Sequence, residues 1–340
     1  MHSSILQTPL AHDRIRCEVC QWRCELAVGE VGRCRVRSHH DNAVIVDAYG
    51  LVSGATIGPI EDQRLWHFFP DAQVFSVGGY GTPLVPPNVA SEALPYALLP
   101  EKARELSPER VVEFAQQRLC RGVLWTFGDP SVAYEWTLDG IKLGRAASRF
   151  TAIATTGYFN PELFAQMAPY LDGMRLDVYG FSAQSYKTLT GFDDWQSIFK
   201  IAAEARQKWN IHVEVALHVT PGVNDSDAEV AALAKWMRVA LGSLTPLHIL
   251  PNRVGDVQLD DATVQRLVST AKTSGVSFVY GPAPHQITRC PNCTWVVVER
   301  SDGPTQLTGV IDDTCEGCRT PLGLRTSLFR RNVRYELASS

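Results

Sequence analysis

Eight of the nine cysteines in this chain fall into two tight groups, as metal ligands often do. The C-terminal group consists of two C-x2-C pairs, Cys290 with Cys293 and Cys315 with Cys318. Each pair can present two thiolates to one side, and the residues between the pairs suit a hairpin. This spacing predicts a zinc-ribbon-like module with one closed four-cysteine zinc site. Such a site stabilises a fold and is not expected to be catalytic.

The N-terminal group lies in the segment CEVCQWRCELAVGEVGRC and predicts a second metal site. Its members are Cys17, Cys20, Cys24 and Cys34. Four thiolates can hold zinc or an iron–sulfur cluster; zinc is favoured, and the cluster remains the alternative. The remaining cysteine, Cys120, follows a predicted helix and is expected to be a buried apolar residue.

Composition limits the class of protein. The 340 residues are 45% hydrophobic and 20% charged, which is ordinary for a soluble globular protein larger than one average domain. A net charge of −4 and a pI of about 6.1 argue against a nucleic-acid partner. Because no apolar run reaches membrane length and no signal peptide is evident, we expect a cytoplasmic protein without a membrane partner. In that reducing compartment, paired cysteines indicate metal ligands rather than disulfides.

Four side chains of the chain could transfer protons. The candidate catalytic residues are Asp129, Asp177, Glu214 and His248. Carboxylates and imidazoles act as general acids or bases when their geometry and pKa suit the reaction. Each candidate also has a structural alternative, namely capping or positioning for the acids and a hydrogen-bonded core imidazole for His248.

The elements that must position these residues begin at about Gln73, where strand-like and helix-like segments start to alternate in six or seven β/α units. Short apolar strands buried on both faces predict an α/β fold with a parallel sheet and outer helices. The number of units fits a partial (β/α)6-type TIM barrel, and a doubly wound sheet is the second possibility. Both folds bind ligands at the carboxyl ends of their strands. The predicted organisation is a Cys-rich metal-binding module over 1–70, the barrel over 71–285 and the zinc-ribbon-like module over 286–340.

Segments along nearly the whole chain resemble radical S-adenosylmethionine (SAM) proteins related to pyruvate formate-lyase activating enzymes, specifically the AmmeMemoRadiSam-type branch. In chain order the segments are RCEVCQWRCELAVGEVGRCRVR, AYGLVSGATIGPIEDQRLWHFFPDAQVFSVGG, TFGDPSVAYEW, TTGYFNPELFAQMAPYLDGMRLDVYGFS, VTPGVNDSDAEV, PLHILPN and the CPNC…CEGC closing ribbon. Each segment alone is a weak signal, whereas seven in the same order are specific. The resemblance implies a radical SAM barrel with SAM at the carboxyl ends of its strands.

The defining motif of that superfamily is missing after the first barrel strand. The resemblance implies C-x3-C-x2-C in the segment FSVGGYGTPLVPPNVAS, with three thiolates holding a four-iron cluster. Register from the strand places Thr82, Pro86 and Val89 at those positions. None of these residues can replace a thiolate at iron, so we expect no radical SAM cluster and no reductive cleavage of SAM. The prolines are expected to fill or cap the former volume of the cluster.

The resemblance implies a SAM pocket that is only partly kept. Its expected cofactor-binding residues are Gly78, Gly79, Tyr80, Gly128, Asp129, Pro130, Thr156, Asp177, Tyr179 and His248. Thr156 replaces an asparagine and Tyr179 a lysine, whereas His248, Asp177, Asn224 and Asp225 are kept. The acid at Asp129 could hold the methionyl ammonium. The rings of Tyr80, Tyr158 and Tyr179 could face the sulfonium, although packing is the alternative.

Two functions from different classes are compatible with this pattern. The first is an enzyme that binds SAM and uses its sulfonium, an activated leaving group, in polar chemistry such as alkyl transfer, elimination or intramolecular cyclisation. This function makes the protein a transferase or lyase without radical steps. The alternative is a non-catalytic regulator or scaffold that binds SAM, another metabolite or a protein partner.

Overall fold

The centre of the fold is a nine-stranded sheet in a computed structural model that describes residues 2–84, 96–301 and 303–328. Its strand order is β15-β14-β13-β12-β11-β10-β8-β7-β9. The strands from β15 through β8 in this order run parallel, and β7 and β9 extend one edge antiparallel. Their bounds are β7 Leu51–Pro59, β8 Gln73–Gly79, β9 Arg104–Glu105, β10 Gly122–Trp125, β11 Phe150–Thr155, β12 Gly173–Val178, β13 His212–Val219, β14 Leu247–Pro251 and β15 Val279–Tyr280.

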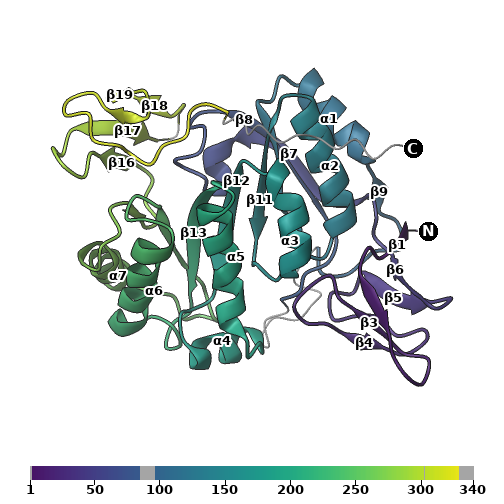
Figure 1. The fold of residues 1–340 in the computed structure, drawn as a ribbon. Helices are drawn as coiled ribbons and strands as arrows, with labels where there is room; N and C mark the ends of the chain where they lie inside the picture. Colours follow the sequence, from purple (N-terminus) through teal and green to yellow (C-terminus); the bar gives the residue numbers. More distant parts are fainter. Residues whose placement is uncertain (1, 85–95, 302, 329–340) are drawn as a thin grey trace.

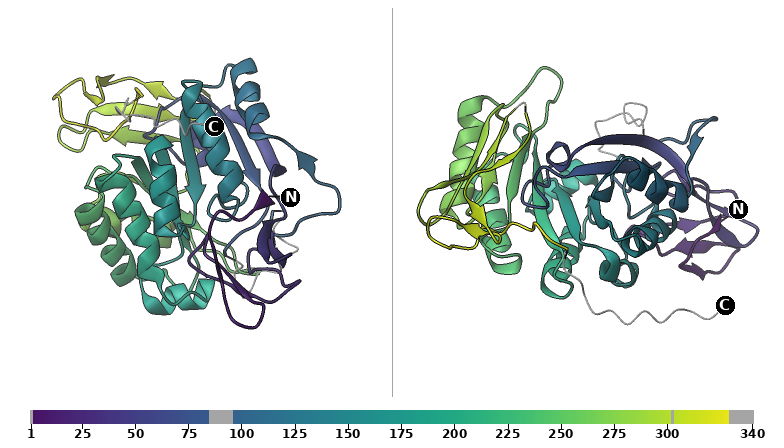
Figure 2. Two further views of the ribbon diagram at one scale, coloured as in Figure 1. Left: turned by 45° about the vertical axis from the view of Figure 1, so that its right-hand side comes forward. Right: turned by 90° about the horizontal axis from the view of Figure 1, so that it is seen from above.

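Helices connect successive parallel strands and cover the outer face of the sheet (Figures 1 and 2). Single α-helices follow β8, β10, β11, β13 and β14, whereas two follow β12. Short 3-10 helices, η1 at Ile60–Gln63 and η3 at Ala168–Tyr170, supplement them. The α-helices are α1 Pro108–Gln117, α2 Tyr134–Ala146, α3 Pro161–Met167, α4 Ala183–Thr190, α5 Trp195–Gln207, α6 Asp227–Ala240 and α7 Asp261–Thr273.

This arrangement confirms the partial (β/α)6 barrel. Its parallel strands follow one another in the sheet in the order in which they occur in the chain. A doubly wound sheet reverses strand order at a switch point, and the described sheet has no such reversal. The strands alternate between residues that face the helices and residues that face the interior of the barrel. A polar residue within one of these buried strands is therefore a candidate for an interior site.

The helix starts follow from local chemistry. The Ser107 side chain accepts a hydrogen bond from the amide of Arg110 and caps α1. Ser182, Ser226 and Asp260 cap α4, α6 and α7 in the same way. Cys120 lies just beyond α1 and is fully buried, which confirms the expected apolar role. Within the described residues, no helix is long and apolar enough to cross a membrane.

Small sheets flank the barrel at opposite ends (Figure 1). The N-terminal sheets are β1-β6-β5 and β2-β3-β4, with bounds β1 His2–Ser3, β2 Gln7–Pro9, β3 Ile15–Cys17, β4 Glu25–Leu26, β5 Arg37–His40 and β6 Ala43–Val46. The C-terminal sheets are β16-β17-β18 and β19-β20, with bounds β16 Gln286–Arg289, β17 Val296–Arg300, β18 Gln306–Leu307, β19 Val310–Ile311 and β20 Thr314–Cys315. Although β7 lies within residues 1–70, it joins the barrel sheet. The module boundaries themselves stay predictions.

Candidate functional site

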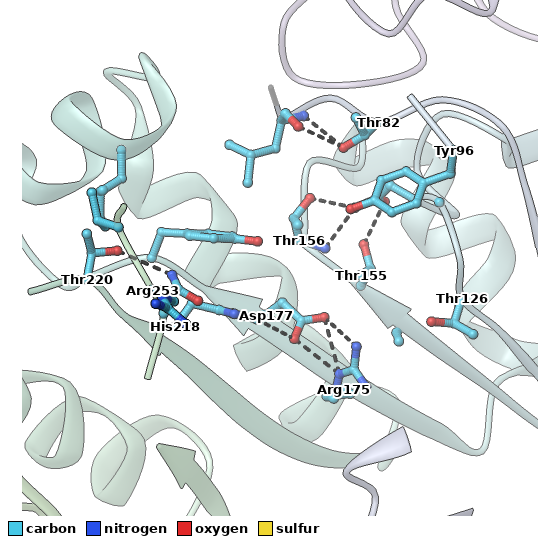
Figure 3. A pocket seen from close by; sticks show the side chains of 18 of the residues that line it. Thr82, Tyr96, Thr126, Thr155, Thr156, Arg175, Asp177, His218, Thr220 and Arg253 are labelled. Carbon is cyan, nitrogen blue, oxygen red and sulfur yellow. Dashed lines mark hydrogen bonds and ion pairs between the residues drawn. The ribbon is translucent and has the colours of Figure 1, made fainter. Parts of the chain in front are cut away.

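A cavity of about 660 Å³ lies at the carboxyl ends of the barrel strands (Figure 3). Residues at or just beyond the ends of β10 to β14 line it, together with Thr82, Leu84 and Tyr96. Its volume falls in the range of cavities that hold a cofactor or drug-sized ligand. Of the expected cofactor-binding residues, those that line it are Gly128, Asp129, Thr156, Asp177 and Tyr179.

The carboxylate of Asp129 is fully occupied by hydrogen bonds from the protein. Its Oδ1 accepts from the Ser131 amide at 2.8 Å and the Thr155 hydroxyl at 2.9 Å. Its Oδ2 accepts from the Thr156 amide at 2.8 Å and the Thr156 hydroxyl at 2.5 Å. A carboxylate offers about four acceptor positions, so these donors use its capacity. In this geometry Asp129 holds the β11 loop in place and has no acceptor position left for a ligand ammonium.

Asp177 instead forms a charged cluster in the wall of the cavity. Its Oδ2 lies 3.0 Å from Arg175 Nη2, and its Oδ1 lies 3.1 Å from His218 Nε2. Burial alone would raise the pKa of Asp177, but the charge of Arg175 and the hydrogen bond from His218 hold it below its ordinary value. Asp177 is therefore an ionised carboxylate at neutral pH, next to one permanent cation.

Aromatic rings complete the cavity beside this cluster. The ring of Tyr179 stacks on His218, with centroids 4.9 Å apart and an interplanar angle of 11°. Burial and the Asp177 carboxylate raise the pKa of the Tyr179 phenol well above its ordinary value, so the phenol is neutral. Tyr96 lies across the cavity near Thr155 and Thr156 (Figure 3). The cavity therefore combines aromatic rings with two carboxylates, Asp129 and Asp177, and two guanidinium groups, Arg175 and Arg253.

The loop after β8 contributes Thr82, the residue at the first expected cysteine position. Its hydroxyl donates to the Leu84 carbonyl and accepts from the Leu84 amide, both at 3.1 Å. The hydroxyl is thus used within its own loop rather than aimed into the cavity. Pro86 and Val89, the other expected cluster positions, lie outside the described residues.

Gly78 and Gly79 do not line the cavity in the described structure and instead permit close packing beneath it. A Cβ atom at Gly78 would lie 1.4 Å from the Thr126 carbonyl oxygen. At Gly128, which has a φ of +154°, a Cβ would lie 2.1 Å from the Gly79 oxygen. These contacts bring the ends of β8 and β10 together, and only glycine fits there.

Tyr80, Tyr158 and Pro130 are likewise absent from the cavity lining among the described residues. Tyr80 is 8% exposed and belongs to the apolar core. The Tyr158 ring packs against Phe192 and Trp22, with centroids 4.8 and 6.1 Å away. The packing alternative therefore describes both tyrosines, and Tyr179 is the one of the three expected rings that faces the cavity.

Glu214 and His248 belong to a separate buried polar cluster nearer the amino ends of the strands, which we call the floor cluster. It comprises His67, His212, Glu214, His248, Tyr280, Thr288 and Arg300. Glu214 is fully buried and accepts from His248 Nε2 at 2.8 Å, from His212 Nε2 at 3.0 Å and from the His67 amide at 2.7 Å. Glu214 and His248 lie near the amino ends of β13 and β14, whereas the cavity lies at the carboxyl ends. Neither residue therefore lines the cavity.

The charge state of the floor cluster follows from its hydrogen bonds. Burial alone would raise the pKa of Glu214, but hydrogen bonds from His212 and His248 hold it well below its ordinary value. Burial lowers the pKa of both histidines, and Glu214 only partly reverses that effect. The cluster thus contains a buried carboxylate with neutral imidazole donors. His67 continues it, since its Nε2 lies 2.7 Å from the Tyr280 hydroxyl.

The cysteine groups lie at opposite ends of the barrel (Figure 1). The Sγ atoms of Cys290, Cys293, Cys315 and Cys318 all lie within 4.8 Å of one another, a spacing that could hold one metal ion. The N-terminal thiols, Cys17, Cys20, Cys24 and Cys34, surround a common small cavity. Each predicted set of four cysteines is therefore gathered at one place, and among the described residues the C-terminal set is the one whose ligand atoms have the spacing of a metal site.

Sequence reasoning did not single out Arg175, His218 or Tyr96. Arg175 places a cation in the cavity wall, although Tyr179 stands at the position where the resemblance implies a lysine. A usable signal was present: Arg175, Asp177 and Tyr179 alternate along β12 and its end, so they share one face. Asn224 acts on the same region, since its side-chain amide donates to the carbonyls of Tyr179 and His218.

Comparison with known proteins gives the relatives of this chain. No protein-family model matches it. The chain is 29% identical over 315 residues to an uncharacterized protein of Methanocaldococcus jannaschii, covering 88% of this chain and 92% of that one. It is 28% identical over 138 residues to the 4-hydroxyphenylacetate decarboxylase activating enzyme of Clostridium scatologenes, covering 40% of this chain and 44% of the enzyme.

A second activating enzyme, the isethionate sulfite-lyase activating enzyme of Nitratidesulfovibrio vulgaris, is 28% identical over 159 residues, 43% of this chain and 52% of the enzyme. The chain thus spans about half the length of these two enzymes. Among solved structures, a radical SAM methyltransferase from Sphaerobacter thermophilus matches with a TM-score of 0.49 and 15% identity, over 63% of this chain and 67% of that chain.

The chain has homologues among radical SAM activating enzymes of the pyruvate formate-lyase activating enzyme kind, in agreement with the resemblance of its motifs. It nevertheless contains no C-x3-C-x2-C segment anywhere in its 340 residues.

Proposed function

We propose that this protein binds SAM in the cavity at the carboxyl ends of its barrel strands and uses the sulfonium in polar, non-radical chemistry. One observation carries the proposal: a ligand-sized cavity retains an ionised acid and aromatic rings, whereas Thr82 closes on its own loop at the first cysteine position. A ligand site without its metal-binding thiolates suits SAM chemistry that needs no electron.

The cavity offers complementary groups for SAM. The sulfonium is a cation, and the Asp177 carboxylate and the faces of Tyr179 and Tyr96 are groups that attract cations. The guanidinium of Arg175 can attract the methionyl carboxylate while it remains bound to Asp177. This assignment replaces Asp129, whose acceptor positions are used by the protein.

Polar chemistry at the sulfonium breaks one carbon–sulfur bond, and its electron pair goes to sulfur, leaving a neutral thioether. Transfer of the methyl group yields S-adenosylhomocysteine. Elimination or cyclisation of the aminobutyryl arm yields methylthioadenosine. Each route also releases a proton from the attacking group or a carbon, and a base must accept it. His218, held by Asp177 at 3.1 Å, is the candidate base that the cavity provides.

The test begins with calorimetric titration of SAM into the protein. We expect binding that Asp177→Asn weakens about tenfold, or about 1.4 kcal/mol. Asp193→Asn removes the same charge from an exposed ion pair with Lys187 and should bind as the wild type does. No binding or thermal shift at millimolar SAM would contradict the proposal.

Catalysis is tested separately by incubating the protein with SAM and analysing the products by mass spectrometry. Methylthioadenosine, S-adenosylhomocysteine or a cyclised amino acid, reduced in amount by His218→Gln, supports the enzyme. Binding without any product supports the second candidate, a SAM-binding regulator or scaffold. The full use of Asp129 and Thr82 by internal hydrogen bonds favours that candidate, since few groups remain for chemistry.

A further inference from the structure

We propose that Cys17, Cys20, Cys24 and Cys34 hold a single zinc ion, and that this ion braces two loops at the wall of the ligand cavity. The proposal concerns a site apart from the SAM cavity and does not rest on the proposed function. Four observations carry it: the small cavity that the thiols share, their backbone turns, the contacts of the segment with the barrel, and a buried cation beside it.

The four thiols line one small cavity. The cavity that they line has a volume of about 10 Å³, about that of one water-sized sphere. Its remaining lining consists of Val19, Gly32, Arg33, Arg37 and Val132. A small shared cavity suits a tetrahedral zinc ion, which takes four thiolates at about 2.3 Å.

The backbone around these thiols resembles that of the C-terminal cysteine set. There, Thr294 and Arg319 directly follow a cysteine in left-handed conformations, and their amides donate to the carbonyls of Cys290 and Cys315. In the N-terminal set, Arg35 directly follows Cys34 with a φ of +64°, and its amide donates to the Gly32 carbonyl. Both sets therefore turn the chain tightly at a cysteine.

The N-terminal cysteine segment is bonded to the loop that follows β11. The Gln21 amide donates to the Tyr158 carbonyl at 2.9 Å, and the Asn160 amide donates to the Val19 carbonyl at 3.1 Å. The Asn160 side chain adds a hydrogen bond to the Glu18 carbonyl at 2.8 Å. The same loop begins with Thr155 and Thr156, which hold Asp129 in the cavity wall.

A second contact reaches the loop that follows β8. A Cβ atom at Gly81 would lie 2.5 Å from the side chain of Val36 and 3.1 Å from the Cys34 carbonyl oxygen. The loop therefore passes directly against the segment that carries the last thiol. Since Thr82 is the next residue, an ion that fixes Cys34 also limits the movement of this cavity wall.

A buried cation lies beside the thiols, and its positive charge is complementary to the negative charge of a four-thiolate zinc site. Arg37 lines the same small cavity, is 2% exposed and donates to the Val132 carbonyl at 2.8 Å. It also pairs with Glu135 on α2. Four thiolates around Zn²⁺ carry a net charge of −2, and a neighbouring guanidinium partly offsets it.

Metal analysis of the purified full chain tests the site. We expect about two zinc ions per chain in the wild type, one in Cys24→Ala, one in Cys318→Ala and two in Cys120→Ala. Cys24 and Cys318 are matched, since each is partly exposed within its set, and Cys120 lies outside both sets. Cys24→His should restore the second zinc because imidazole is also a zinc ligand.

Hydrogen exchange tests the bracing. Cys24→Ala should raise exchange over residues 79–84 and 155–160 and leave 296–300 unchanged, whereas Cys318→Ala should not affect the two loops. Two zinc ions in Cys24→Ala, or about four irons with labile sulfide in the wild type, would overturn the zinc site. Unchanged exchange in the zinc-depleted Cys24→Ala protein would overturn the bracing.

If Cys24→Ala does not fold, cobalt titration of the metal-depleted wild type decides the question. Two equivalents of cobalt with thiolate charge-transfer and tetrahedral bands support the proposal, and saturation at one equivalent overturns it.

Discussion

The barrel uses polar residues in opposite ways at its two ends. At the cavity end, Asp177, Arg175 and His218 form a cluster that borders open space of about 660 Å³. In the floor cluster, Glu214 is completely enclosed and its hydrogen bonds end on other protein groups. Strand β13 supplies both ends, with Glu214 near its amino end and His218 near its carboxyl end, so height along the strand separates a ligand site from a structural core.

This difference gives a rule for interpreting a polar residue in a buried strand. A charge that is satisfied only by protein groups stabilises one arrangement of the core, and its loss is expected to reduce stability. A charge that borders a cavity remains accessible to a ligand, and its loss is expected to reduce binding more than stability. Variants at the two ends should therefore have different effects.

The largest effect is expected for Glu214→Ala. This change leaves the His67 amide and the imidazoles of His212 and His248 without their buried acceptor. We expect the free energy of unfolding to fall by about 3 kcal/mol or more. Urea denaturation followed by circular dichroism measures it, with exposed Glu101→Ala as control. A loss below about 1 kcal/mol would contradict the comparison.

The second-largest effect is expected when the pH is changed, because the free energy of unfolding depends on the protonation of the floor cluster. Burial lowers the pKa of His67 to about 3, whereas the unfolded chain has a histidine pKa of about 6.5. The unfolded state therefore takes up the proton first. The contribution of His67 to the free energy of unfolding is complete above about pH 6.5. It falls as the pH decreases toward 3, by up to about 1.4 kcal/mol per pH unit for this one group.

Urea midpoints between pH 7.5 and 4.5 measure this dependence. His67→Asn should make the slope shallower, whatever its effect on absolute stability, and exposed His285→Asn should leave it unchanged. Below about pH 4, protonation of Asp177 and Glu214, whose pKa values are lowered in the folded state, should add a further loss. An unchanged slope in His67→Asn would remove His67 from the explanation.

A smaller effect on stability is expected at the cavity end. Asp177→Asn should lower the free energy of unfolding by about 1 kcal/mol, less than Glu214→Ala, because Arg175 keeps its hydrogen bond to the Gln63 carbonyl. Its SAM affinity should fall about tenfold, as proposed above. Thermal unfolding with and without SAM measures both quantities. If Asp177→Asn destabilised the protein as much as Glu214→Ala, the distinction between the two ends would fail.

The smallest effect is expected at Thr82. Thr82→Cys weakens the two hydrogen bonds to Leu84, for a loss of about 0.5 kcal/mol, and should bring no iron, since the sequence has proline and valine at 86 and 89. Iron analysis after anaerobic reconstitution checks this, and Thr82→Ser keeps the hydroxyl as control. Stoichiometric iron in Thr82→Cys would show that the loop can still form a cluster.

The sequence predicted the barrel and the cysteine sets well because their signals are local. Alternating apolar strands and capped helices, such as the one at Ser107, appear directly as patterns, and C-x2-C pairs are short. The cavity was predicted only in part. Whether Glu214 or Asp177 faces a ligand depends on its height in the barrel and on which donors surround it, and those donors come from distant segments.

Asp129 illustrates the limit of sequence reasoning. Its position after β10 was identified correctly, but two of its donors come from Thr156, 27 residues later. A sequence pattern gives the residue type and does not show that all acceptor positions are used. Arg175, conversely, could have been noted from its alternation with Asp177, because a charged pair in an otherwise apolar strand must find partners inside the barrel.

The long-range bonds of the floor cluster constrain the order in which the chain can acquire its native core. Arg300 Nη2 donates to the Trp66 carbonyl at 2.6 Å across 234 positions of sequence, and His67 Nδ1 lies 3.1 Å from the Leu322 carbonyl oxygen. During synthesis on the ribosome, the barrel strands emerge well before these partners. The hydrogen bonds of the floor cluster can therefore form only after the C-terminal sheets have been synthesised. We expect the last stage of folding to be slow and coupled to the formation of those sheets.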